Sequence, residues 1–284
     1  MGRLGIQVSF EDGETQTQYL EAQIADVVKA IVHFRPLRNW KGEYGFDWFR
    51  DNLVEKETKA NKIIDYNTWV GNYYTDATFR SLFQGDNSWS NFFQLNQPAL
   101  QDLKNTYSPF NTYSVEDDGL GNEITKEYFI PKLALFAETD NILPFNAELQ
   151  LYLEFGINEV ENPERIEFEI SPMIPVEPVP EIPITIDPPI INNPGNKVKL
   201  NIACTDVFDE DVLITAYAVR GTGRIEAGKI QVIAPSKKRE KEVVIVRVKS
   251  KRGTTGNIRR SVLRKTEKIL KQSLTTLNLS LIHI

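Results

Sequence analysis

The residues best suited to catalysis are few in this chain of 284 residues. Cys204 is the only cysteine, and the two histidines are His33 and His283. This set gives no Ser-His-Asp or Cys-His arrangement, no HExxH motif and no cysteine-based zinc site. The sequence therefore predicts no catalytic residue, no metal ligand and no cofactor, and it leaves open whether the chain belongs to an enzyme. His33, in the apolar run KAIVHFRPL, is expected in the core or at its boundary, and Cys204 is expected to be a buried structural thiol.

Carboxylates supply one further catalytic hypothesis. Glu43 with Asp47 or Asp51 has the composition of an acid–base pair. The aromatic residues of the same segment fall on the opposite face of an extended chain: Tyr44, Phe46 and Trp48. We therefore favour a core strand whose rings point inward, with Gly45 permitting a close approach of backbone.

A second group of candidate residues is aromatic. Residues 62–113 interleave aromatic rings with Asn, Thr, Ser and Asp and show no clean periodicity. We expect a compact region of loops and short helices held together by packed rings. In the alternative, exposed rings stack on the sugar rings of a glycan. The candidate binding residues for that alternative are Trp69, Tyr73, Tyr74 and Trp89.

The elements that must position these residues are mostly strands. The segment LGIQVSF, the turn EDGE and the segment TQTQYL predict a hairpin. Residues 25–36 fit either a helix or a strand, because helical spacing coincides with four β-branched residues. From about residue 126 the pattern is wholly β, with three alternating segments before a proline-rich run and four after it. The fold class is mainly β, with immunoglobulin-like β-sandwich modules.

Composition divides the chain into expected units. These are a β-rich and aromatic domain at 1–122, a β-sandwich-like module at 123–171, a Pro-rich connector at 172–195 and a second such module at 196–250. Both of these modules are shorter than a complete β-sandwich. They are therefore either two minimal modules or one sandwich with the proline run along its edge. Since proline lacks a donor N–H, that run predicts a polyproline-like connector or an edge strand.

The chain ends with two distinct segments. Residues 251–278 carry apolar residues at helical spacing with Arg and Lys between them, which predicts a basic amphipathic helix that opens a further, truncated domain. The last six residues, LSLIHI at 279–284, match one reading frame of a transposon end used to prepare sequencing libraries. We interpret them as adapter read-through; the alternative is a short strand that completes a sheet.

Charge is unevenly distributed along the chain. Residues 1–195 hold 14 Lys and Arg against 31 Asp and Glu, whereas residues 196–284 hold 19 against 8. We expect the basic part to dock on the acidic part or to be the first element of the next domain, rather than to bind nucleic acid. The chain contains no run of 18 apolar residues, so no membrane span is predicted. The N-terminus also lacks the apolar core of a secretory signal. The chain is therefore expected to be cytoplasmic as synthesised, with any export by a signal-peptide-independent apparatus.

Two short stretches carry a resemblance. FRPLRNWKGEYGFDWFR at 34–50 resembles the opening of large proteins associated with Bacteroidota type VI secretion systems. Residues 200–232, with the pattern L-x-I-x-C followed by A-G-K-I-x-V, are similar to β-rich middle modules of that group. The resemblance implies a protein partner among secretion-apparatus components, and some members of the group carry a zinc-peptidase-like domain after such modules.

Three functional hypotheses follow. The first is a non-catalytic interaction or delivery region of a larger bacterial protein. The second is a carbohydrate-binding module, based on the aromatic residues at 62–113. The third is the front part of an exported enzyme whose catalytic domain lies downstream.

Overall fold

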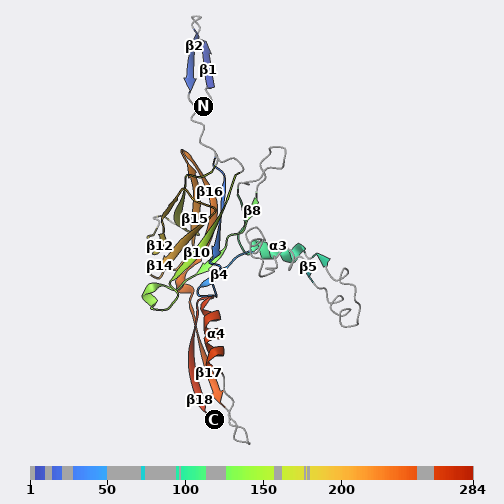
Figure 1. Cartoon of the computed structure of the whole chain (residues 1–284), viewed down its shortest axis with the longest axis vertical. Coiled ribbons are helices and arrows are strands. Elements are labelled where there is room, and N and C mark those ends of the chain that lie inside the picture. The colour runs from blue at the N-terminus through green and yellow to red at the C-terminus, as the bar shows by residue number, and fades with distance from the viewer. Residues whose placement is uncertain are drawn as a thin grey trace.

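Strands dominate the structure, a computed structural model shown in Figure 1. It describes residues 4–9, 15–20, 28–49, 72–73, 94–95, 97–112, 126–156, 162–175, 177, 180–247 and 259–283. The mainly β class expected from the sequence is confirmed. The predicted N-terminal hairpin is also present: β1 (Leu4–Ser9) pairs antiparallel with β2 (Thr15–Leu20).

Two sheets form the centre of the molecule. The first has the strand order β12 (Ile184–Asp187), β14 (Lys197–Cys204), β10 (Asn146–Phe155) and β3 (Ala30–Pro36). The second has the order β13 (Ile190–Asn192), β11 (Arg165–Pro172), β15 (Val212–Arg220), β16 (Gly223–Ile233), β9 (Lys132–Ala134) and β4 (Gly45–Asp47). Neighbouring strands are antiparallel, except that β16 and β9 are parallel.

The two sheets share one hydrophobic core, so they form a β-sandwich. Strand β10 illustrates how the sequence builds it: Leu149, Leu151 and Leu153 alternate with polar residues and are at most 3% exposed. Because successive side chains of a strand point to opposite faces, this alternation buries one face and leaves the other in contact with water. The predicted inward face of β10 is confirmed.

Strand β3 settles the ambiguity between helix and strand at 25–36. It lies at the edge of the first sheet and pairs with β10 from Ala30 to Pro36. Its residues are buried from Ala30 to Arg35, because the second sheet covers it through β16. His33 is 4% exposed, and its Nε2 lies 2.8 Å from Oε1 of Glu154, which confirms a satisfied core histidine.

The segment after β3 has the predicted alternation. Tyr44, Phe46 and Trp48 are all buried in the core, whereas Glu43 and Asp47 are exposed. Cys204 is fully buried at the end of β14, as expected of a structural thiol.

The strands do not follow the predicted domain boundaries. Strand β10, from the unit expected at 123–171, pairs with β14, from the unit expected at 196–250. Strands β3 and β4, from the unit expected at 1–122, pair in the same two sheets. The boundaries at 122/123 and 195/196 thus pass through one sandwich, the second of the two arrangements that the sequence left open. Strand length and turn spacing predict where strands occur but not which strands pair. The predicted boundaries therefore separated strands that belong to the same sheets.

The proline-rich run contributes the outer strands. Strand β12 lies at the edge of the first sheet and β13 at the edge of the second, so the short segment between them carries the chain from one sheet to the other. A strand that lacks donors is tolerated at such an edge. The edge-strand alternative is therefore the one observed for residues 184–192.

Short elements occupy part of the aromatic region. They are β5 (Asn72–Tyr73), β6 (Gln94–Leu95), helix α3 (Gln97–Asn105), β7 (Phe110–Thr112) and β8 (Lys126–Tyr128). Two 3₁₀ turns, η3 (Glu138–Asp140) and η5 (Pro235–Lys237), follow β9 and β16. Side chains of α3 and β8 add two small clusters beside the main core.

The C-terminal part is a β-α-β unit. Strand β17 (Arg239–Arg247) is followed by helix α4 (Arg260–Lys271) and by β18 (Thr275–His283), which pairs parallel with β17. Figure 1 places this unit at the opposite end of the sandwich from the β1–β2 hairpin. The helix is confirmed, but β17 was expected in the second sandwich module and instead forms a separate ribbon. Residues 279–283 of the expected read-through segment lie in β18. Among the described helices, none has the length and apolar character needed to span a membrane.

Candidate functional site

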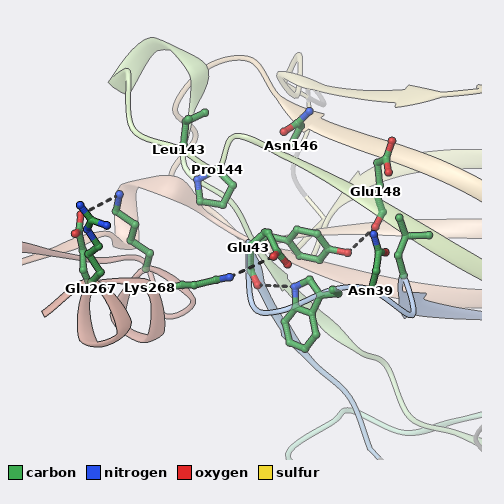
Figure 2. Close-up of a pocket in the computed structure, with 13 residues that line it drawn as sticks. Asn39, Glu43, Leu143, Pro144, Asn146, Glu148, Glu267 and Lys268 are labelled. Carbon is green, nitrogen blue, oxygen red and sulfur yellow. Dashed lines mark hydrogen bonds and ion pairs between the residues drawn. The ribbon is translucent and has the colours of Figure 1, made fainter. Parts of the chain in front are cut away.

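A groove of about 740 Å³ lies where α4 meets the sandwich (Figure 2). Its volume is within the range of pockets that hold ligands or short segments of a partner. Three segments supply its walls: the loop after β3, the loop before β10, and one face of α4. The lining residues are Leu37, Asn39, Trp40, Glu43, Tyr44, Leu143, Pro144, Asn146, Glu148, Arg264, Glu267, Lys268 and Lys271.

The loop after β3 is a tight turn that presents Trp40. The N–H of Trp40 donates to the carbonyl of Leu37 at 2.9 Å, and its indole N–H donates to the carbonyl of Tyr44 at 3.3 Å. The half-buried ring of Trp40 packs against Tyr44 and Trp48, with centroids 5.9 and 6.4 Å apart. Gly42 supplies the positive φ of +81° that this turn requires. The indole is thus held in place before any ligand arrives.

The loop before β10 forms the opposite wall. The carbonyl of Pro144 accepts a hydrogen bond from the N–H of Phe136 at 2.9 Å, which fixes this loop to the sandwich. The hydroxyl of Tyr44 donates to the carbonyl of Glu148 at 2.5 Å and so ties the two walls together. Burial raises the pKa of Tyr44 well above its ordinary value, so the hydroxyl remains a donor at physiological pH. Leu143 stands beside this joint with 64% of its surface exposed.

Helix α4 turns its charged face toward the sandwich. Arg264, Lys268 and Lys271 recur four and three residues apart, so they lie on one face of the helix, and all three line the groove. The amide of Gln272 donates to the carbonyl of Gly42 at 3.3 Å, and the backbone of Gln272 lies directly against Gly45. A side chain at position 45 would clash with the Gln272 carbonyl, so the predicted close approach at Gly45 is observed.

Two ion pairs neutralise most of the lining charge. Nζ of Lys268 lies 3.2 Å from Oε1 of Glu43, which joins α4 to the sandwich, and Nζ of Lys271 lies 3.2 Å from Oε1 of Glu267 (Figure 2). Desolvation acts to raise the pKa of Glu43, but the backbone N–H groups of Lys41 and Glu43 and the ammonium of Lys268 outweigh it and lower that pKa. Glu43 therefore carries its charge at physiological pH. The docking of a basic C-terminal helix on an acidic residue near the N-terminus agrees with the expected internal use of the charge asymmetry.

Two lining charges are left for an incoming group. The side chains of Arg264 and Glu148 make no hydrogen bond or ion pair with another residue in the described part of the chain. The apolar side chains of Trp40, Leu143 and Pro144 line the same groove. The groove thus combines apolar surface with a cation and a carboxylate that pair with no other described residue.

The residues proposed from the sequence as a binding site are placed only in part. Tyr73 lies in β5, opposite Gln94 of β6. Trp69, Tyr74 and Trp89 lie outside the described residues. The carboxylates considered for acid–base chemistry have separate partners, because Glu43 pairs with Lys268 whereas Asp47 accepts the hydroxyl of Tyr107 at 3.0 Å. Asp51 lies outside the described residues.

The groove itself was not predicted. Trp40 belongs to the stretch 34–50 but precedes its aromatic alternation, and no local pattern indicates that it lines a groove. The basic face of α4 was recognised, yet no local pattern indicates that residue 268 meets residue 43.

Within the described residues, no group of three or more His, Cys, Asp or Glu side chains is arranged to hold a metal ion. Comparison of the chain with protein-family models, with curated proteins and with solved structures found no match.

Proposed function

We propose that this chain is a non-catalytic interaction region of a larger bacterial protein and that its groove receives a peptide segment of a partner protein. The observation that carries the proposal is Leu143, a large apolar side chain 64% exposed at the wall of a preformed, charged groove. Protein interfaces concentrate their binding energy in a few apolar or aromatic anchors with polar groups around them. Leu143 and Trp40 supply the anchors, and the charged residues of α4 supply the rim.

The groove favours a peptide because it combines apolar side chains with charges of both signs. An extended segment can place one apolar side chain against Leu143 and Trp40 while an acidic side chain meets Arg264. A basic side chain of the same segment would meet Glu148. Opposite charges at these positions fix the register of the segment more than they add affinity.

The wider setting that we propose is a type VI-like secretion apparatus. Its support is the resemblance of residues 34–50, and Trp40 and Tyr44 of that stretch line the groove. The partner would then be a tube or spike component. The hypothesis that the region precedes a catalytic domain stands beside this one, since an interaction region and an enzyme can share one chain.

Capture from cells that carry such a system tests the proposal. The full chain is immobilised, and retained proteins are identified by mass spectrometry and then purified for affinity measurements. We expect a tube or spike component, bound at least about tenfold more weakly by Leu143→Asp, as for an interface hot spot. Ile174→Asp is the matched control, because Ile174 is 65% exposed and lies outside the groove. Equal loss of binding by both variants, or none by either, would count against the groove.

A glycan is the second candidate ligand, and one feature favours it. The half-buried indole of Trp40 lies in the same groove as the exposed amides of Asn39 and Asn146. A flat ring stacks on a sugar, and amides bond its hydroxyl groups. Binding on a glycan array that Asn146→Ala abolishes and Ile174→Asp leaves intact would favour this candidate over the peptide.

A further inference from the structure

A second pocket lies where the sandwich meets the C-terminal β-α-β unit. Its volume of about 430 Å³ is within the range of pockets that hold small ligands. Its walls come from β4 and β9, from the segment that joins β16 to β17, and from the turn between α4 and β18. The pocket and the groove described above have no lining residue in common.

Positive charge dominates the walls of this pocket. Lys132, Lys237 and Arg239 line it, against the carboxylate of Asp47. The three cations come from separate elements, since Lys132 begins β9, Lys237 ends η5 and Arg239 begins β17. An anion in the pocket would therefore be attracted from the sandwich and from the C-terminal unit at once.

Two of the cations have no counter-ion. The side chain of Arg239 makes no hydrogen bond or ion pair with another described residue, and only its backbone N–H is used, in a bond of 2.8 Å to the carbonyl of Leu274. Lys132 pairs with no carboxylate in the described part of the chain. Its Nζ lies 5.9 Å from the ring centre of Tyr107, a contact that leaves its hydrogen-bond donors available.

The other two charges already have partners. Lys237 pairs with Asp211 at 2.7 Å, and Asp47 accepts the hydroxyl of Tyr107 at 3.0 Å. Because Asp211 balances Lys237, the remaining lining charges are two cations against one carboxylate. The pocket thus keeps an excess of positive charge that a bound anion would neutralise.

We propose that this pocket binds the phosphoryl group of a small phosphorylated molecule. A phosphate monoester carries about −1.5 to −2 charges at pH 7 and three strong acceptor oxygens. The planar fork of an arginine suits two such oxygens, which leaves the third for the ammonium of Lys132. Phe46 and Ile233 line the same pocket and offer apolar surface to the rest of the ligand. The bound phosphoryl group would join the sandwich to the C-terminal unit through Lys132 and Arg239.

Calorimetric titration of the full chain with inorganic phosphate tests the assignment. The buffer is free of phosphate and low in ionic strength, and circular dichroism verifies that each variant is folded. We expect saturable binding, which Arg239→Gln and Lys132→Gln should each weaken at least about tenfold because hydrogen bonds to a charged group are lost. Arg239→Lys keeps the charge without the planar fork, so its affinity should lie between those of the unaltered chain and Arg239→Gln.

Lys265→Gln is the matched control, because it removes the same charge from an exposed residue of α4 that lines neither cavity. It should change the affinity for phosphate by less than about twofold. Acetate, with a single charge and two oxygens, should bind at least about tenfold more weakly than phosphate. Three results would each overturn the proposal: phosphate binding that does not saturate, equal weakening by Lys265→Gln and Arg239→Gln, or acetate binding as tight as that of phosphate.

Discussion

The Cys204 thiol is buried beneath the loop that follows β14. Its Sγ lies 3.2 Å from the carbonyl oxygen of Asp206, and burial raises its pKa from 9.0 to about 12. Since the thiolate is the reactive form, a shift of this size lowers its population on the order of a thousandfold at neutral pH.

We therefore expect Cys204 to react with a thiol reagent at pH 8 only as fast as the sandwich unfolds. Because it is the only cysteine, labelling reports this one site. The measurement compares labelling rates of native and denaturant-unfolded protein. Rapid labelling of the native protein would show that the site is open, contrary to its burial.

Asp211 holds together the segment that follows β16. It accepts hydrogen bonds from the N–H of Ala234 at 2.9 Å and from the amide of Gln231 at 2.8 Å, and it pairs with Lys237 at 2.7 Å. Desolvation acts to raise its pKa, but these donors outweigh it and lower the pKa below 3.8. A carboxyl with a lowered pKa in the folded state stabilises the fold at neutral pH and loses that contribution as the pH falls through the lowered value.

Asp211→Asn should lower the free energy of unfolding by about 1–3 kcal/mol at pH 7, because hydrogen bonds to a charged acceptor are lost. The difference between the two proteins should begin to shrink below about pH 4, where the unfolded chain takes up the proton, and should be lost only below the lowered pKa of the folded state. Urea unfolding at several pH values measures it. A difference that stays constant down to pH 2 would mean that the charge of Asp211 contributes nothing.

Single elements differ in how far sequence predicts them. The alternation of β10 and the period of α4 are local, so both are predictable from composition and spacing. Strand β3 is not, because its buried residues fit a helix as well and only the covering second sheet decides for a strand. The partner of a strand is harder to predict than the strand itself. The sequence of β17 is compatible with a place in the sandwich as well as with the observed ribbon with β18.

The orientation of α4 was the least predictable feature of an element. An amphipathic helix ordinarily buries its apolar stripe. Here Val262 and Ile269, seven residues apart on one face, are 51% and 64% exposed, while the charged face lines the groove against the sandwich. The ion pair between Lys268 and Glu43 and the bond from Gln272 to Gly42 accompany this orientation. Both contacts join residues more than two hundred positions apart, so no local pattern contains them.

At the scale of the molecule, one close contact makes the two sheets a single unit. Gly228 of β16 lies against β3 so closely that a Cβ would fall within 3.0 Å of the carbonyl oxygen of Val32. The hydroxyl of Tyr128 donates to that carbonyl at 2.8 Å and lies 3.2 Å from the carbonyl of Lys229, which ties both sheets at the same point. Since strands from the units predicted at 1–122, 123–171 and 196–250 and from the Pro-rich connector share this core, they should unfold together.

Gly228→Ala should accordingly destabilise the whole sandwich by about 1–3 kcal/mol, because backbone on both sides must move apart. Gly195→Ala is the matched control: position 195 is exposed, with no atom within 4 Å of a Cβ, so it should change stability by less than about 1 kcal/mol. Urea unfolding, followed by tryptophan fluorescence and by circular dichroism, should show one coincident sandwich transition that shifts as a unit in the Gly228 variant. Two separate transitions, with only the later one shifted, would instead mean that residues 123–171 and 196–250 fold as independent modules despite their shared sheets.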